Sequence, residues 1–269
     1  MNDYLATCGA ALFAGTGAWI GYRFSRIPNR WWVLGYFIPL ALVVTYGLAV
    51  RVPSLGFLPP ISWMMMGRQR FALIGFISAM VLTTPLSRLP LKRDRTVVGV
   101  LAMVIVSVMA VFPFLAPAFN HERLARLETQ VGTDGVCRQT TEYTCGPAAA
   151  VTALRKLGLS ADEGPLAVLC HTSQFAGTEP DVLAETLRDT YRKDGLKANY
   201  RPFKNLAELR QAGLTLAVVK FGLMVDHFIT VLEVTDTEVL VGDPLSGFDR
   251  LSHDEFLRKW RFVGVVLQR

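Results

Sequence analysis

Charged residues are scarce in this sequence and unevenly spread. Only 19% of the 269 residues are charged, against about 25% in an ordinary soluble domain, and 51% are hydrophobic. The first 120 residues contain just two acidic side chains, Asp3 and Asp94, against ten Lys and Arg, a formal charge of +8. The rest contain twenty acids against eighteen Lys and Arg, a charge of −2. The sequence therefore predicts a basic membrane region at 1–120 joined to a near-neutral globular domain.

Several motifs are missing, and each absence removes a class of function. The four cysteines have no CxxC spacing, which argues against a zinc ribbon or a thioredoxin-like site. No GxxxxGK[ST] phosphate loop is present, so nothing in the sequence indicates ATP hydrolysis. The basic residues are not gathered in one folded part, so the sequence pI of 9.3 does not indicate nucleic acid as a partner. No metal or organic cofactor is expected.

Long uncharged runs predict four membrane-spanning helices, at residues 5–22, 31–50, 71–87 and 96–117. The first run is not expected to be a secretory signal peptide, because no Lys or Arg precedes it. Its Gly17 and Gly21 form a GxxxG pair, a pattern that is common by chance but also lets helices approach closely. Residues 52–66 are too short and too rich in proline for a fifth span, and are predicted to form an interfacial loop.

The distribution of Lys and Arg gives only a weak indication of orientation in a bacterial plasma membrane. The loops after the first and third spans carry seven Lys and Arg, and the other side carries five. This bias favours an extracytoplasmic C-terminal domain, and a fifth span would reverse that side. Within the four spans the only ionisable residues are Cys8 and three tyrosines, so no ion pathway is expected. The region is predicted to anchor the protein in the lipid bilayer.

The second part is predicted to be a stalk at 121–136 followed by an α+β domain at 137–269, with helices packed on an antiparallel sheet. Helix patterns cover residues 147–157, 179–190, 205–211 and 252–260. Strand patterns rich in Val, Ile, Leu and Phe follow at 214–221, 227–234, 238–243 and 262–267. Helices followed by a run of closely spaced strands are typical of this architecture.

Cys145 differs from the other cysteines in its neighbours. It lies in the segment Tyr143-Thr144-Cys145-Gly146-Pro147-Ala148-Ala149-Ala150, where glycine permits close approach, proline suits the start of a helix and the alanines propagate it. The sulfur is therefore expected at a helix N-terminus, where the helix dipole favours a thiolate. A thiolate is the form that acts as a nucleophile.

His227 and Asp243 are the predicted base and its orienting partner. If residues 235–237 form a turn, residues whose numbers sum to about 470 face each other, which places His227 opposite Asp243 with Cβ atoms about 5 Å apart. An aspartate there would hold one tautomer of the imidazole while the other ring nitrogen faces the thiol. Asp226 is the less favoured alternative, because adjacent strand residues point to opposite faces. His171 and His253 are expected to be solvated or packed.

Gln139 is the candidate oxyanion donor. It precedes Cys145 by six residues, in a segment expected to run extended past the start of the helix. Its side-chain amide could join the Cys145 backbone N–H in binding a developing oxyanion. Residues 172–178 are turn-like and are either a plain helix connection or a border of the substrate cleft.

Residues 137–269 resemble the bacteriocin-processing, double-glycine leader peptidases, a branch of the papain-like cysteine peptidases. The resemblance rests on Gln139-Thr-Thr-Glu-Tyr-Thr-Cys145-Gly146-Pro147-Ala148-Ala149, on His227-Phe228, on Asp243-Pro244 sixteen residues later, and on Glu255-Phe256 and Trp260. It implies Cys145 as nucleophile, His227 as general base and later acid, Asp243 as orienter and Gln139 in the oxyanion hole. In the best-known members the peptidase domain comes first and is followed by membrane helices and an ATP-binding cassette, and it works in the cytoplasm. Here the helices come first.

The sequence therefore predicts a membrane-anchored thiol peptidase that cleaves a peptide or protein substrate, with Gly-Gly leader sites implied by the resemblance and a separate transporter as a further partner. A thiol acyltransferase and a catalytically idle peptide-binding domain remain alternatives. If the domain is extracytoplasmic, Cys137 and Cys170 are candidates for a disulfide, although their spacing does not require one.

Overall fold

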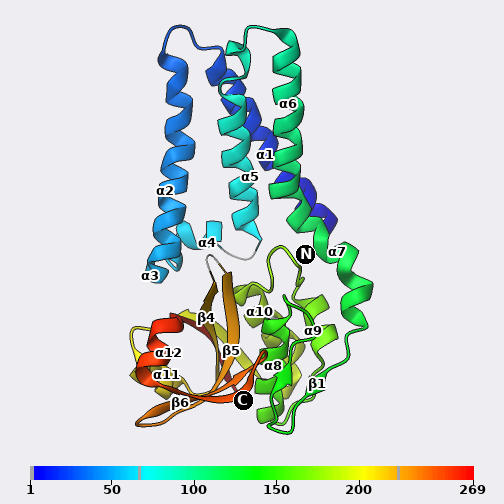
Figure 1. Cartoon of the computed structure of the whole chain (residues 1–269), viewed down its shortest axis with the longest axis vertical. Helices are drawn as coiled ribbons and strands as arrows, with labels where there is room; N and C mark the ends of the chain where they lie inside the picture. The colour runs from blue at the N-terminus through cyan, green and yellow to red at the C-terminus, as the bar shows by residue number, and fades with distance from the viewer. Residues whose placement is uncertain (1–2, 66–67, 223–224) are drawn as a thin grey trace. The chain divides into compact units, whose positions relative to one another are not determined.

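A computed structural model describes residues 3–65, 68–222 and 225–269, and these form two compact units. Unit 1 comprises residues 1–118 and is helical where described, and unit 2 comprises residues 119–269 and contains the strands that the structure describes (Figure 1). The helices that begin in unit 1 are α1 (Asp3–Ser25), η1 (Trp31–Tyr36), α2 (Phe37–Arg51), α3 (Pro53–Gly56), α4 (Ile61–Met65), α5 (Gln69–Thr83), η2 (Leu86–Arg88), α6 (Lys92–Val106), η3 (Ser107–Val111) and α7 (Phe112–Ala125).

Three helices of the described chain are long and apolar enough to cross a membrane, judged by length and composition. They span Trp31–Arg51, Gln69–Arg88 and Lys92–Ala125. α1 is also long, at 23 residues, but is not among the three. The segment 52–66 forms the short helices α3 and α4 in its described part. The predicted count of four spans thus stays a prediction.

The GxxxG pair of α1 is a packing surface for α5. A Cβ atom added at Gly17 would lie 2.5 Å from the backbone oxygen of Phe76, and one added at Gly21 would collide with Thr83 and Met80. The two helices can therefore approach only because both positions lack a side chain. At the end of α1, Ser87 donates its backbone N–H to the Ser25 hydroxyl (2.8 Å).

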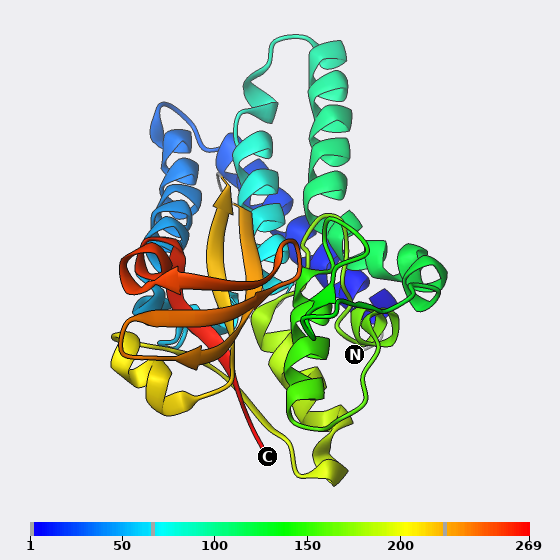
Figure 2. The same cartoon turned by 60° about the horizontal axis from the view of Figure 1, so that its bottom comes forward.

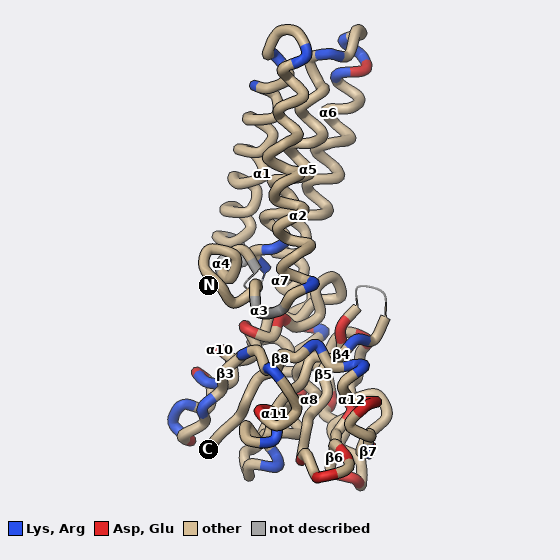
Figure 3. The backbone as a smooth tube through the Cα atoms, turned by 90° about the vertical axis from the view of Figure 1, so that its left-hand side faces the viewer, with Lys and Arg blue, Asp and Glu red and all other residues tan. Residues whose placement is uncertain are grey.

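This contact brings two basic loops of unit 1 to the same end of the bundle. Arg88 Nε donates to the Ser25 carbonyl oxygen at 3.1 Å, so the loop after α1 and the loop before α6 lie together. Figure 3 shows their Lys and Arg gathered there. The sequence predicts these two loops on the same side of the membrane, and their position at one end of the bundle is consistent with that prediction.

Unit 2 is an α+β domain, and the fold predicted for it is confirmed. Its helices after α7 are α8 (Cys145–Lys156), α9 (Glu163–Leu169), α10 (Pro180–Thr190), η4 (Arg192–Asp194), α11 (Leu206–Ala212) and α12 (His253–Lys259). Its strands are β1 (Gln130–Val131), β2 (Cys137–Arg138), β3 (Lys197–Pro202), β4 (Thr215–Gly222), β5 (Val225–Val234), β6 (Glu238–Asp243), β7 (Gly247–Ser252) and β8 (Trp260–Gln268).

The main sheet has six strands in the order β3-β8-β4-β5-β6-β7, all antiparallel, and β1 pairs with β2 separately. α8 and α10 contact the sheet, as do α11 and α12 (Figures 1 and 2). A buried cluster joins α11, α12 and the strands β4, β5, β6 and β8, with the fully buried Phe256 on α12 and Trp260 on β8 among its largest side chains. This part of the domain core is thus built in part on β5 and β6, the strands that carry His227 and Asp243.

Candidate active site

Cys145 is the first residue of α8, two residues earlier than the predicted start of this helix. Its side chain is nearly buried, and all residues from Cys145 to Leu154 are buried with it. Pro147 is accommodated because the first turn of a helix has N–H groups without intrahelical partners. A helix of small residues can therefore lie deep in the domain while its N-terminus presents the thiol.

Two hydrogen bonds tie α8 to its surroundings. The Thr230 hydroxyl on β5 donates to the Ala149 carbonyl oxygen at 2.8 Å, and the Thr152 hydroxyl accepts the backbone N–H of Cys137 at 2.9 Å. All of these groups are buried, so the bonds form away from competing water. The first bond holds the Cys145 helix against β5, the strand that carries His227, and the second holds it against β2.

His227 lies near the start of β5, is 5% exposed, and contacts both candidate partners. Its Nε2 is 2.7 Å from Asp243 Oδ1, which leaves Nδ1 for the hydrogen bond with Cys145. Burial alone would lower the pKa of His227, but the hydrogen bonds to Asp243 and Cys145, and the charges of both, raise it to about 9. The imidazolium is thus the favoured form at neutral pH.

Asp243 is the last residue of β6. Its burial opposes ionisation, but hydrogen bonds from His227 and from the Leu245 backbone N–H (2.8 Å to Oδ1) outweigh that effect and hold its pKa below the usual value. The carboxylate is therefore ionised at neutral pH and faces the imidazolium directly.

The predicted strand register that led to this pair is wrong by two. Thr230 pairs with Gly242, so paired residue numbers sum to 472 there, and His227 and Asp243 are diagonal neighbours rather than directly opposite. The turn lies at the predicted residues 235–237, but a turn centred on Asp236 pairs residues whose numbers sum to about 472 rather than 470, and an irregularity at Leu232 shifts the register by one residue. Diagonal neighbours on one face are still within reach of a long side chain, and the imidazole spans the gap.

Gln139 follows β2 and is anchored by its backbone beside Asp243. Its N–H donates to the Pro244 carbonyl oxygen at 3.0 Å. Its side-chain Nε2 donates to the Thr141 carbonyl oxygen at 2.8 Å, which leaves the second N–H of the amide for another acceptor. The Oε1 atom is buried and has no hydrogen-bond partner among the described residues.

The other candidate residues lie in different environments. Asp226 pairs with Arg261, at 2.8 Å from Nε. His253 hydrogen-bonds the Thr235 carbonyl oxygen at 3.1 Å, and His171 has a left-handed backbone, with φ 51°. The structure thus gives Asp226 a partner other than His227.

Cys137 and Cys170 are both free and buried. Burial raises the pKa of each thiol to about 12, and the charge of Glu163 adds to the effect at Cys137. The structure contains no disulfide between them, in contrast to the pairing considered for an extracytoplasmic domain.

The sequence profile described as the Peptidase C39 family matches residues 134–269, half of the chain. The chain belongs to the Peptidase C39 family. Its C39 domain is therefore of the cysteine peptidase type, with the papain-like fold of helices on an antiparallel sheet.

Similar proteins cover the same part of the chain. An uncharacterized protein of Methanothermobacter marburgensis is 29% identical over 52% of this chain and 92% of its own length, and one of Methanothermobacter thermautotrophicus is 28% identical with the same coverage. Among solved structures, a double glycine motif protease from an AMS/PCAT transporter in complex with the leader peptide is 18% identical, covering 53% of this chain and 94% of its own, with a TM-score of 0.43. The peptidase domain of Streptococcus ComA is 19% identical, covering 52% and 98%, with a TM-score of 0.43.

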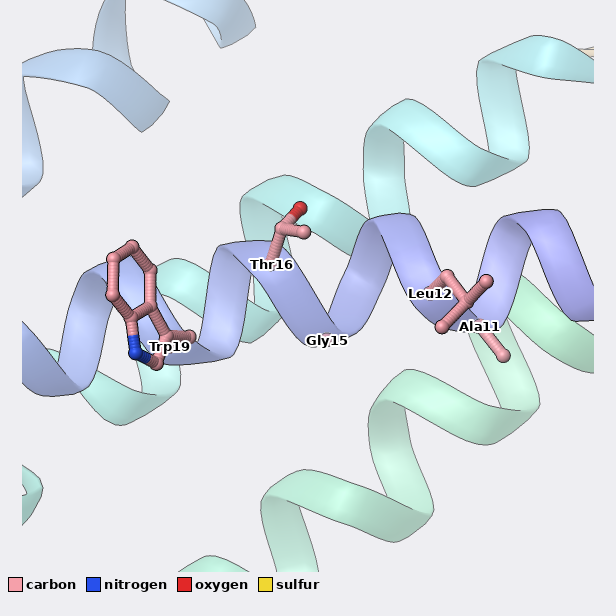
Figure 4. A pocket seen from close by; sticks show the side chains of 5 residues that line it. All are labelled: Ala11, Leu12, Gly15, Thr16 and Trp19. Carbon is pink, nitrogen blue, oxygen red and sulfur yellow. The ribbon is translucent and has the colours of Figure 1, made fainter.

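Two surface hollows are lined by none of these residues. One, of about 410 Å³, runs along α1 in unit 1 and is lined by Ala11, Leu12, Gly15, Thr16 and Trp19 (Figure 4). None of these side chains can act as a nucleophile or base near neutral pH, so the hollow offers no peptidase chemistry. The other, of about 370 Å³, is lined by residues of β3, β8 and α11. In the described part of the chain, no three His, Cys, Asp or Glu side chains are grouped as metal ligands.

Two further residues of the C39 domain lie near the candidate site, one at the end of the turn-like segment 172–178 and one with no signal in the sequence. Thr178 packs on Gly146, next to Cys145, where an added Cβ would lie 2.9 Å from the Thr178 Cβ. Glu163 is wholly buried and hydrogen-bonds Thr140, the neighbour of Gln139. A glutamate at the start of a helix is ordinarily solvated, so no sequence signal indicates its burial.

Proposed function

We propose that this protein is a membrane-anchored cysteine peptidase in which Cys145, His227, Asp243 and Gln139 carry out the reaction. The observation that carries the proposal is the hydrogen-bonded series from Cys145 through His227 to Asp243, with the pKa of His227 raised to about 9. Membership in the Peptidase C39 family supports the reaction type.

Acylation begins when the Cys145 thiolate attacks the carbonyl carbon of the scissile peptide bond. The electron pair of the carbonyl moves to its oxygen, and the resulting oxyanion accepts hydrogen bonds from the Cys145 backbone N–H and from the free N–H of the Gln139 amide. When the intermediate collapses, the C–N bond breaks and the leaving amine takes the proton of the His227 imidazolium. The acyl group remains on sulfur as a thioester.

Deacylation reverses the roles. Neutral His227 takes a proton from water as the water oxygen attacks the thioester carbonyl, and collapse of the second oxyanion breaks the C–S bond. The products are a carboxylic acid and the Cys145 thiolate beside the imidazolium. Asp243 stays ionised throughout and holds Nε2 of His227, so Nδ1 faces the reacting atoms.

The proposed substrate is a leader peptide with a Gly-Gly site. The sequence resemblance suggests this class, and the close packing of Thr178 on Gly146 supports a crowded passage beside the thiol. Crowding there would exclude large side chains and favour glycine. The three apolar helices support anchoring in a bilayer, and a separate transporter remains the proposed partner.

The test is peptide cleavage by the full chain in detergent. We expect the wild type to cleave a leader peptide after Gly-Gly, and in water enriched in heavy oxygen to place that oxygen in the new carboxylate. Cys145→Ala should abolish cleavage, while Cys8→Ala, which removes an exposed thiol of α1, should not. Acyl transfer to an added amine without hydrolysis would identify a transferase, and binding of the peptide without either reaction would identify an idle domain.

A further inference from the structure

Glu163 is a buried carboxylate whose hydrogen bonds converge on one residue. It is 0% exposed, and its Oε1 accepts both the backbone N–H of Thr140 (2.9 Å) and the Thr140 hydroxyl (3.1 Å). Its Oε2 has no hydrogen-bond partner in the part of the chain that the structure describes. Burying a carboxylate is unfavourable unless it is hydrogen-bonded, so the fold loses stability if Glu163 and Thr140 separate. The two hydrogen bonds from Thr140 therefore hold these two residues together.

Thr140 lies within the segment that positions Gln139. The Thr140 N–H belongs to the peptide group that follows Gln139, and the Gln139 N–H, in the peptide group before it, donates to the Pro244 carbonyl oxygen at 3.0 Å. Both peptide planes beside the Gln139 Cα are thus held. The Gln139 Nε2 then donates to the Thr141 carbonyl oxygen, so the side-chain amide is held as well.

Glu163 is itself fixed at the start of α9. Its backbone N–H donates to the Thr129 hydroxyl at 2.9 Å, and that hydroxyl donates to Asp162 Oδ1 at 3.2 Å. Gly164, the next residue, lies so close to the C-terminal end of α7 that an added Cβ would be 2.5 Å from the Leu124 carbonyl oxygen. The carboxylate therefore has little freedom to follow a displaced Thr140.

We propose that Glu163 is a positioning residue for the oxyanion site: through Thr140 it fixes the Gln139 amide in the place where the oxyanion forms. The inference rests on the proposed peptidase function. A charged acceptor bonds the N–H and the hydroxyl more strongly than a neutral amide does. Loss of the charge would loosen the segment and misplace the amide, while Cys145 and His227 stay in place on α8 and β5.

The test uses Glu163→Gln in the full chain, which keeps the shape of the side chain and removes its charge. Removal of an entire oxyanion donor costs about 100-fold or more in kcat, so we expect its displacement to lower kcat by about tenfold with KM unchanged. Alkylation of Cys145 by iodoacetamide forms no oxyanion, so its rate should stay at the wild-type value. Glu185→Gln, the same change at an exposed position of α10, is the matched control and should have no effect.

A double-mutant comparison separates positioning from general stability. If Glu163 acts through Gln139, then Glu163→Gln should add no further loss of kcat to Gln139→Ala. An equal loss in both backgrounds, or a parallel loss of Cys145 alkylation, would show a merely structural role and overturn the proposal.

Substitutions at Thr140 give a second test that does not depend on the folding of the Glu163 variant. Thr140→Val keeps the backbone N–H and removes the hydroxyl, so kcat should fall by a few-fold, and Thr140→Ser should restore it. Wild-type kcat in Thr140→Val would contradict the proposal. If the wild type does not cleave the Gly-Gly peptide at all, the proposed function fails and the inference with it; if the wild type and Glu163→Gln cleave equally, only the inference fails.

Discussion

Asp243→Asn is expected to lower the fraction of charged His227 and with it the reactivity of Cys145. In the wild type the pKa of His227 is about 9, so at about pH 8 roughly 90% of the imidazole is protonated. Without the carboxylate, only burial, which lowers the pKa of His227, and the interaction with Cys145, which raises it, remain. A return to the ordinary value of 6.5 would leave only about 3% protonated, about 30-fold less.

The assay is the pH dependence of kcat/KM for the Gly-Gly peptide, together with the rate of Cys145 alkylation. The wild-type profile should fall above about pH 9, where His227 loses the proton that the leaving amine needs. In Asp243→Asn that fall should move to lower pH, and activity at about pH 8 should drop by about 30-fold or more. Asp226→Asn is the matched control, because that carboxylate pairs with Arg261, and its profile should match the wild type. An unchanged profile in Asp243→Asn would refute the assigned cause of the raised pKa.

The same shift has a consequence for stability. The folded-state pKa of His227 lies above its unfolded value of 6.5, so its contribution is fully present below about pH 6.5 and is lost as the pH rises through about 9. A shift of this size corresponds to about 3 kcal/mol. Denaturant unfolding should therefore show His227→Gln losing less stability than the wild type between these pH values. An equal loss of stability in the two proteins over this pH range would contradict a link between His227 protonation and folding.

Three further predictions concern residues around the site. Burial raises the pKa of Cys137 and of Cys170 to about 12, so at about pH 8 only about one molecule in ten thousand should carry a thiolate at either position. Peptide mapping after brief iodoacetamide treatment should find both cysteines unmodified. Modification at the rate of an exposed thiol would show instead that they are accessible. Gly146→Ala should destabilise the domain by about 1–3 kcal/mol and reduce kcat/KM, because the new methyl group collides with Thr178. Thermal unfolding and cleavage assays measure the two effects. Wild-type stability and kcat/KM in this variant would show that Thr178 can move aside without cost. Thr230→Val should cost about 1 kcal/mol and lower Tm by about 2–4 °C through the lost bond to α8, and an unchanged Tm in calorimetry would contradict that role.

Elements with strong local signals were predictable from the sequence. The start of α12 carries the capping box Ser252 to Glu255, Asn205 caps α11, and Gly158 follows α8 with a left-handed backbone. Their physical basis is local, since each signal satisfies backbone groups within a few residues. The strands β4, β5, β6 and β8 were recognisable because their apolar side chains are buried.

Features set by long-range packing were not predictable in this way. Both edge strands of the main sheet, β3 and β7, were missed, because their side chains are largely polar and partly exposed. The register of β5 and β6 depends on an irregularity at Leu232 that no local pattern indicates. The burial of Glu163 likewise depends on Thr140, 23 residues earlier in the chain. The order and type of the residues along the chain thus indicated the candidate site. The structure was needed to find the residues that hold the site in place.

The central claim, that Cys145 is the nucleophile of a peptidase, is tested most directly by an affinity label. A leader peptide ending in Gly-Gly with a C-terminal chloromethyl ketone is incubated with the full chain, and the modified residue is located by mass spectrometry while cleavage of the unmodified peptide is followed. We predict one adduct, on Cys145, that forms in step with the loss of cleavage and is absent in Cys145→Ala. Modification of another residue, or continued cleavage by protein labelled at Cys145, would contradict the claim.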